Sequence, residues 1–120
     1  MAAKTVTLLD VAKGLQLEQL DLKPADVGGT AKGYQITARR LRGGLSEGVD
    51  EIRVNNGAFS FSVLPTRGMS IWKAWHGTEE LGWRSPVHGP VHPAYVQISE
   101  PSGLGWLDGF DELLVRCGLE

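Results

Sequence analysis

The feature that most constrains the fold is the turn sequence Asn55-Asn56-Gly57, which joins two stretches of alternating residues. Before it, residues 49–54 alternate apolar and polar side chains imperfectly around two acids. After it, residues 59–63 alternate Phe and Val with Ser. Asn-Gly tolerates the positive φ angles that tight hairpins need, and a period of two indicates half-buried strands. The sequence therefore predicts an antiparallel hairpin.

Further short stretches of β-branched, aromatic and apolar residues predict more strands, and none of them shows a helical period of 3.6 residues. They cover residues 5–11, 34–41, 69–75, 79–83 and 113–119. Residues 15–22 begin with alternation and then change phase, which predicts a strand or an irregular segment between Gly14 and Pro24. Sixteen glycines favour tight turns between these elements. We therefore expect an all-β, antiparallel fold.

Other segments predict connections rather than strands. Residues 23–33 contain Pro and several Gly and predict a connector. Residues 85–101 contain four prolines, which predicts a long irregular loop of the kind that often carries function. Residues 105–114 could form a single helical turn around Trp106. In the strand at 69–75, alternation places Ile71, Lys73 and Trp75 on one face, and we expect at least one of Trp72 and Trp75 to be buried.

Composition limits the class of protein. Hydrophobic residues make up 42% and the net charge is −2, which argues against disorder and against nucleic-acid binding. A single cysteine excludes a disulfide within the chain. No apolar run is long enough to span a bilayer, and the first residues lack the apolar stretch of a signal peptide. We expect a cytoplasmic protein with no cofactor and no membrane partner.

Several short motifs occur in an order that resembles a known family. They are Leu41-Arg-Gly-Gly, Gly48-Val-Asp, Asn56-Gly57, Val63-Leu-Pro-Thr-Arg-Gly-Met69, Trp83-Arg-Ser-Pro86, Gly89-Pro-Val-His-Pro93, Gly105-Trp-Leu-Asp-Gly-Phe110 and Cys117-Gly-Leu119. In this order they resemble the aldose 1-epimerase-like proteins of the galactose mutarotase-like group. The resemblance covers about two thirds of the chain.

The resemblance implies a galactose mutarotase-like antiparallel β-sandwich, of which this chain would be the N-terminal portion only. Residues 1–42 would supply N-terminal strands and a connector, and residues 43–120 would begin the sandwich domain, which would be truncated at its C-terminus. In such proteins a His and a Glu open the sugar ring by acid and base catalysis. Both would lie beyond Glu120, so the resemblance assigns no catalytic residue to this chain and leaves enzymatic activity open.

Five residues are candidates for sugar contact: Arg67, His88, His92, Trp83 and Trp106. Arg67, in a Pro-Thr-Arg-Gly turn, could offer a fork of donors to hydroxyls, or could pair with Glu51 or Asp50 and pin the turn. Indole rings pack well against sugar C–H faces, and Trp106 lies in a Gly-rich loop suited to a groove wall.

The same segments allow other interpretations. His88 and His92 are four residues apart, but Pro90 lies between them and Pro93 follows, so the pair is not on a helix and we expect no metal. His92 could contact a sugar or pin its loop. Asp108, Asp111 and Glu112 would form a solvated face or a helix cap. Cys117 would be a small buried residue.

Three functions from different classes remain open on sequence alone. The chain could be part of a sugar isomerase, a binding module that holds an aldose or derivative without turnover, or an inactive fragment. A partial sandwich would also leave an open sheet edge, which invites self-association.

Overall fold

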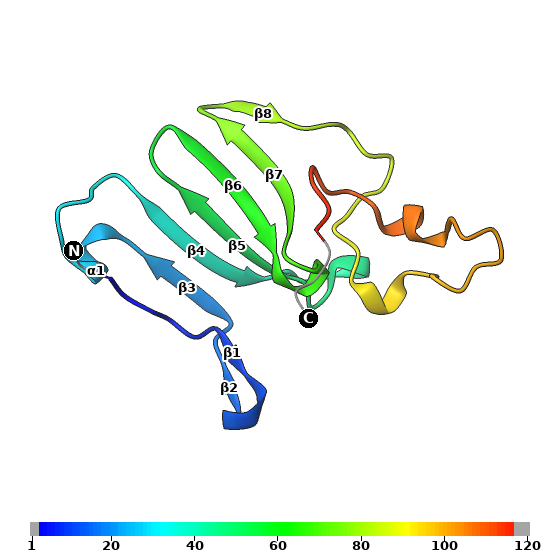
Figure 1. The fold of residues 1–120 in the computed structure, drawn as a ribbon, viewed down its shortest axis with the longest axis horizontal. Coiled ribbons are helices and arrows are strands. Elements are labelled where there is room, and N and C mark those ends of the chain that lie inside the picture. The colour runs from blue at the N-terminus through cyan, green and yellow to red at the C-terminus, as the bar shows by residue number, and fades with distance from the viewer. Residues whose placement is uncertain (1–2, 117–120) are drawn as a thin grey trace.

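The computed structural model describes residues 3–116, and its main element is a six-stranded antiparallel sheet in the order β3-β4-β5-β6-β7-β8. Figure 1 shows the strands side by side in sequence order, with the segment after β8 folded back beside one end of the sheet. The strands are β3 (Gln19–Leu22), β4 (Gln35–Arg40), β5 (Asp50–Asn55), β6 (Phe59–Leu64), β7 (Ser70–His76) and β8 (Glu79–Leu81). The prediction of an all-β, antiparallel fold is confirmed.

The predicted hairpin forms from β5 and β6, with Val54 opposite Phe61 and Asn55 opposite Ser60. Its turn is held by two asparagine side chains: Asn55 Oδ1 accepts from the Gly57 N–H at 2.7 Å, and Asn56 Oδ1 accepts from the Phe59 N–H at 2.8 Å. Gly57 has a φ of 101°, which explains the need for glycine there. Local turn chemistry therefore specifies this hairpin.

The predicted faces of β7 are wrong because the β6–β7 register shifts between Ser62 and Val63. Lys73 lies opposite Ser62, whereas Ile71 lies opposite Val63. Consecutive strand residues point to opposite faces, so Ile71 and Lys73 lie on different faces. A β-bulge inserts one residue and breaks the alternation that the sequence suggested. Trp72 and Trp75 are both half-buried, so the expectation that one is buried is also wrong.

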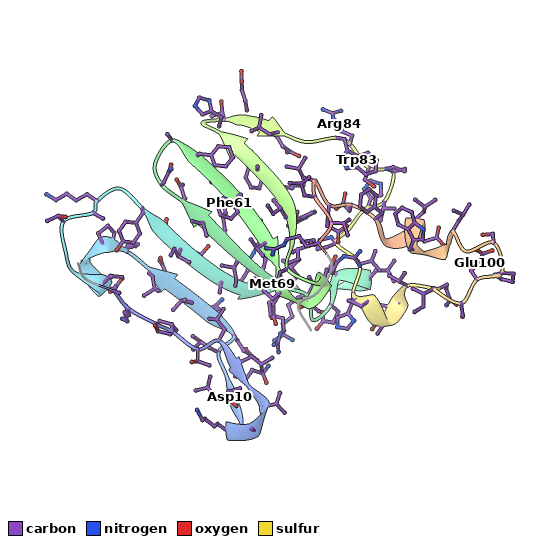
Figure 2. All side chains as sticks on the ribbon, in the orientation of Figure 1. Asp10, Phe61, Met69, Trp83, Arg84 and Glu100 are labelled. Carbon is purple, nitrogen blue, oxygen red and sulfur yellow. The ribbon has the colours of Figure 1, made fainter. Side chains whose placement is uncertain are left out.

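The pairing register divides the sheet into two faces of different chemistry. The polar face carries Gln35, Thr37, Arg39, Glu51, Arg53, Asn55, Ser60, Ser62, Lys73 and Trp75. The apolar face carries Leu20, Leu22, Ile36, Ala38, Ile52, Val54, Phe61, Val63, Ile71, Ala74 and Leu81. Figure 2 labels Phe61 near the middle of the sheet.

The N-terminal part is less regular than predicted. The strand expected at residues 5–11 is reduced to β1 (Leu9–Asp10), which pairs with β2 (Leu15–Gln16) across the 3-10 turn η1 (Val11–Lys13). The connector contains a one-turn helix, α1 (Pro24–Val27), in which Asp26 accepts from the Lys23 N–H at 2.8 Å. Proline at the first helical position and an acid in the first turn favour such a turn even beside glycines.

The segment after β8 is irregular, as predicted, apart from two 3-10 turns, η4 (Pro93–Tyr95) and η5 (Gly105–Gly109). The strand expected at residues 113–119 is represented by one isolated bridge between Leu114 and Ile71, and Cys117 lies outside the described residues. Two more 3-10 turns flank the central hairpin. The turn η2 (Gly44–Ser46) precedes β5, and η3 (Pro65–Arg67) follows β6. Among residues 3–116, no helix combines the length and apolar character that crossing a bilayer requires.

Candidate functional site

A pocket of about 410 Å³ opens where η3, η4 and η5 meet at one end of the sheet. Arg67, Trp106, Phe110 and Glu112 line it together with Pro93 and Val96. We call it the Arg67 pocket. Two of the five predicted site residues, Arg67 and Trp106, are thus brought together although they lie 39 positions apart in the sequence.

The turn that carries Arg67 is fixed from both sides. The Asp50 N–H donates to Thr66 Oγ1 at 2.9 Å, and the Met69 N–H donates to the Leu64 carbonyl at 3.1 Å. Gly68 has a φ of 64° and Met69 a φ of 61°, so the chain turns sharply before β7. Arg67 is therefore delivered to the pocket by a rigid turn.

Arg67 forms an ion pair with the buried Glu112: its Nε donates to Glu112 Oε1, and its Nη1 donates to the Val91 carbonyl at 2.7 Å. The Ser70 hydroxyl also donates to Glu112 Oε1 at 3.3 Å, and the Asp111 N–H donates to Glu112 Oε2 at 3.0 Å. Both carboxylate oxygens are therefore occupied, and the pair ties η3 to the segment that follows η5.

The sequence left open that Arg67 pairs with an acid such as Glu51 or Asp50. Its acidic partner is Glu112 instead, and Glu51 and Asp50 bind Arg39 at 2.7 Å and Arg40 at 3.0 Å. Each of these last two pairs joins residues directly opposite each other on β4 and β5, where cross-strand neighbours are closest. The hydrogen bond that Arg40 donates to the Asp50 carboxylate raises the pKa of Arg40.

The expectation for the acidic group is wrong at Glu112, which is 1% exposed instead of solvated. Asp111 is half-buried and accepts from Trp72 Nε1 at 2.9 Å. Glu112 lies 45 positions from its partner Arg67, and no local pattern marks such a pairing. The sequence pattern, three acids around one turn, predicted a solvated face or a helix cap.

Aromatic rings form the other wall of the pocket. Trp106 is 48% exposed and packs edge-on against Phe110, with ring centroids 5.6 Å apart. Trp83 lies on Phe110 as well, at 5.5 Å, and its Nε1 donates to the Glu112 carbonyl at 3.0 Å. Trp83 does not line the pocket, so its contacts support Phe110 and Glu112 from outside it. The predicted sugar-contact role of Trp83 stays untested.

Two glycines let η5 approach the neighbouring loop. A Cβ on Gly105 would lie 1.8 Å from the Gln97 carbonyl oxygen, and one on Gly109 would lie 2.7 Å from Val96 Cγ2. Side chains at these positions would push η5, and with it Trp106, away from the pocket. The Gly-rich loop is therefore needed for close packing.

The two histidines are placed outside the pocket. His88 is exposed. His92 adjoins the pocket residue Pro93, and its Nδ1 accepts from the Ala94 N–H at 3.1 Å. The His92 N–H also donates to the Leu45 carbonyl at 2.7 Å. These contacts favour the loop-pinning role that the sequence left open for His92.

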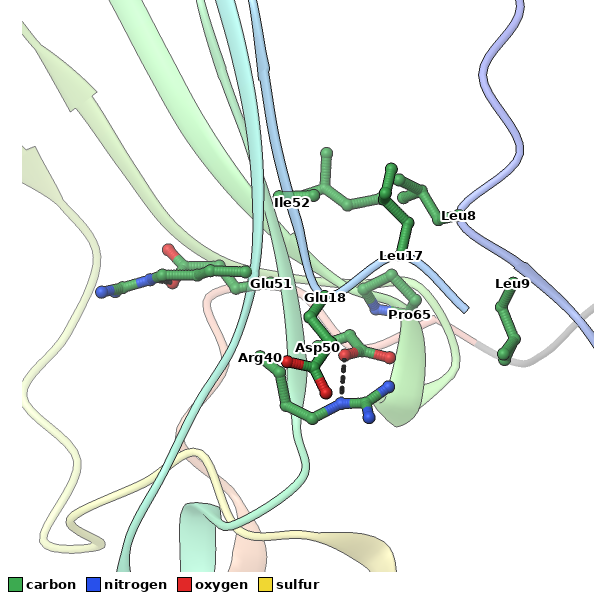
Figure 3. Close-up of a pocket in the computed structure, with 11 residues that line it drawn as sticks. Leu8, Leu9, Leu17, Glu18, Arg40, Asp50, Glu51, Ile52 and Pro65 are labelled. Atoms are coloured by element: carbon green, nitrogen blue, oxygen red, sulfur yellow. Dashed lines mark hydrogen bonds and ion pairs between the residues drawn. The ribbon is translucent and has the colours of Figure 1, made fainter. Parts of the chain in front are cut away.

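No cluster of three or more His, Cys, Asp or Glu that could hold a metal ion occurs in the described part of the chain. A second, smaller cavity of about 90 Å³ lies between the sheet and the N-terminal segment that carries Leu8, Leu9 and Leu17. Figure 3 shows Leu8, Leu9 and Leu17 on one side of it and the Arg40–Asp50 ion pair on another. Its size fits a few atoms, so the Arg67 pocket is the better candidate for a ligand.

Comparison with known proteins identifies a similar solved structure. The chain is similar to the crystal structure of a "putative aldose 1-epimerase" from Klebsiella pneumoniae subsp. pneumoniae MGH 78578, with a TM-score of 0.81 and 28% sequence identity over 95% of this chain. This similarity confirms the resemblance to aldose 1-epimerase-like proteins and the β-sandwich class. The chain spans 30% of the length of that protein. No curated protein matches the sequence.

Residues 46–120, more than half of the chain, match the family described as "Domain of unknown function (DUF4432)". The match includes every residue of the Arg67 pocket named above. The chain belongs to the DUF4432 family.

Proposed function

We propose that the Arg67 pocket binds a carbohydrate, as part of an aldose 1-epimerase-like protein. The observation that carries the proposal is the placement of Arg67 and Trp106 in one pocket. The name of the similar Klebsiella protein supports a sugar as the ligand. A volume of about 410 Å³ falls in the range of small-molecule sites, roughly 300–1,000 Å³.

The chemistry of the walls suits a sugar. The half-exposed indole of Trp106 offers an apolar surface for ring C–H groups and an N–H donor. Arg67 uses Nε and Nη1 for contacts within the chain, and its Nη2, which forms no hydrogen bond with residues 3–116, can donate to hydroxyls. Because Glu112 holds the guanidinium in place, little side-chain entropy would be lost when a ligand binds.

The pocket favours binding over turnover. Ring opening needs a proton donor and a proton acceptor on opposite sides of the acetal. Glu112 is the carboxylate in the described wall of the pocket, and its oxygens already accept from Arg67, Ser70 and the Asp111 N–H. This saturation supports the second candidate, a binding module without catalysis, for residues 3–116. The division at residues 42 and 43 and the cytoplasmic location remain predictions.

Tryptophan fluorescence tests the proposal. We expect a panel of aldoses and uronic acids to include a ligand that changes the emission of the protein saturably. Trp106→Ala should abolish the change. Trp75→Ala is the matched control, because Trp75 lies on the polar face of the sheet under Arg53 and outside the pocket. The control should retain the response.

Calorimetry on the same ligands provides the second readout. A response that survives Trp106→Ala with unchanged affinity would place the sugar elsewhere. No heat and no fluorescence change for any sugar at millimolar concentration would contradict carbohydrate binding.

A further inference from the structure

The side chains around the Arg67 pocket offer many hydrogen-bond donors. Arg67 and Arg116 both line the pocket, and a guanidinium group carries five N–H donors and no acceptor. The indole of Trp106 adds an N–H group that can only donate. A ligand that satisfies these groups must therefore bring hydrogen-bond acceptors.

The acceptors of the pocket are engaged within the chain. Glu112 is the one acidic residue among the described residues that line it. Its Oε1 accepts from Arg67 and from the Ser70 hydroxyl, and its Oε2 accepts from the Asp111 N–H at 3.0 Å. A sugar hydroxyl that donates to Glu112 would compete with these contacts. The pocket thus favours a ligand group that accepts over one that must also donate.

The charged residues that line the pocket leave a net positive charge. Arg67 and Glu112 form an ion pair, so the charge of Arg116 has no counter-charge among the described lining residues. The acids nearest to Glu112 in the sequence do not line the pocket: Asp111 accepts from Trp72 Nε1 at 2.9 Å, and Asp108 is exposed. The donors of the pocket therefore belong to a positively charged site.

Strand β7 brings the two arginines to the same end of the sheet. Arg67 ends the turn η3, which lies just before β7. On β7 itself, the Ile71 N–H donates to the Leu114 carbonyl at 2.9 Å, and the Leu114 N–H donates to the Ile71 carbonyl at 3.0 Å. Because this bridge is antiparallel, the chain after Leu114 runs toward the start of β7 and carries Arg116 to the turn of Arg67.

We propose that the Arg67 pocket selects a uronic acid, a sugar that carries a carboxylate, over a neutral aldose. The inference rests on the proposed carbohydrate binding and names the chemical class of its ligand. An ionised carboxylate only accepts hydrogen bonds, so it matches the donors of Arg67 Nη2 and Arg116. Charge-assisted hydrogen bonds are about twice as strong as those between neutral groups. The ring of the sugar would pack on Trp106.

A carboxylate suits the pocket better than a phosphate. Two arginines and one glutamate line the pocket, so its net charge matches the single negative charge of a carboxylate. A phosphate monoester carries a charge of about −1.5 to −2 at pH 7, part of which would stay uncompensated. The planar guanidinium also matches the two oxygens of a carboxylate. We therefore expect uronates to bind more tightly than hexose 6-phosphates.

Isothermal titration calorimetry on the 120-residue chain tests the proposal with sugar pairs that differ only at C6. The pairs are D-glucuronate with D-glucose and D-galacturonate with D-galactose, and the two hexose 6-phosphates form a third arm. We expect at least one uronate to bind at least about tenfold more tightly than its neutral partner. Because salt screens charges, this preference should shrink as the ionic strength rises.

Arg116→Gln tests the residue that leaves the pocket positive. The variant should lower the affinity for the uronate by about tenfold and change the affinity for the neutral aldose by less than about twofold. Arg116 is exposed, so the far-UV circular dichroism should stay unchanged. Arg84→Gln is the matched control: it removes the same charge from an exposed residue outside the pocket and should keep the preference.

The possible failures are distinguishable. Equal affinities for each uronate and its neutral partner would overturn the selection of an acid and leave carbohydrate binding intact. Tighter binding of a hexose 6-phosphate than of the uronates would refute the choice of a carboxylate. A preference for uronates that survives Arg116→Gln would contradict its assignment to this pocket. No heat for any of these sugars would refute carbohydrate binding and this inference together.

Discussion

Replacing Glu112 by Gln should destabilise the protein strongly, because it leaves Arg67 without a counter-charge at a site that is almost closed to water. The side chain of Glu112 is 2% exposed and that of Arg67 14%. Breaking a buried pair by removing one partner costs about 3–5 kcal/mol. Arg67 keeps its bond to the Val91 carbonyl, so we expect the lower end, about 3 kcal/mol.

Urea denaturation followed by tryptophan fluorescence measures this loss. With a denaturant slope of about 1–3 kcal/mol/M, a loss of about 3 kcal/mol lowers the unfolding midpoint by about 1–3 M. All samples should be compared at one protomer concentration, because self-association would otherwise change the apparent stability.

A double-mutant cycle separates the pair from its surroundings. Glu112→Gln, Arg67→Met and the double variant should give a coupling energy of about 2–3 kcal/mol. The Arg39–Glu51 pair is the matched control, since it also joins Nε to a Glu oxygen but leaves the Arg39 side chain 61% exposed. Its coupling should be below about 1 kcal/mol. Equal couplings in the two cycles would refute the argument from burial.

Three further outcomes follow from the structure. Gly105→Ala should destabilise the protein and weaken sugar binding, because the new methyl group would collide with a backbone carbonyl; an unchanged urea midpoint would contradict this. Ser62→Ala removes a 2.7 Å hydrogen bond to the buried Glu51 and should cost about 1–3 kcal/mol in the same urea assay. The backbone N–H of Gly43 lowers the pKa of Glu47, so this carboxylate stabilises the fold above its unfolded-state pKa and loses that effect as pH falls through its folded-state pKa; NMR titration of the Glu47 side chain should show a midpoint below that of a free glutamate.

Much of the sheet could be predicted from the sequence because its turns and its alternation depend on residues that are close together in the chain. The Asn-Gly turn and the alternation around it predicted β5 and β6, and alternation likewise predicted β4. The prediction of the β7 faces failed where a bulge interrupts the alternation. The bulge between Ser62 and Val63 changes which β7 residues share a face, and alternation alone does not reveal an inserted residue.

The candidate site was predictable only in part. Arg67 and Trp106 were singled out because turns and loops lie at the surface, where an arginine or a tryptophan can reach a ligand. The partner of Arg67 was missed, because Glu112 reaches it across 45 residues and no periodicity links them. His88 and His92 were candidates for sugar contact, but neither lines the pocket, and His92 uses Nδ1 to hold its own loop.

The sequence by itself determined the strand pattern, the antiparallel class and the resemblance to aldose 1-epimerase-like proteins, since these depend on local turn chemistry and on ordered motifs. Only the tertiary structure decided which charge neutralises Arg67, which aromatic rings form the pocket and which side chains share a face of the sheet. Those features depend on contacts between segments that are far apart in the sequence. The energies of these contacts depend on how deeply the side chains are buried. Burial is a property of the folded chain and not of any single stretch of residues.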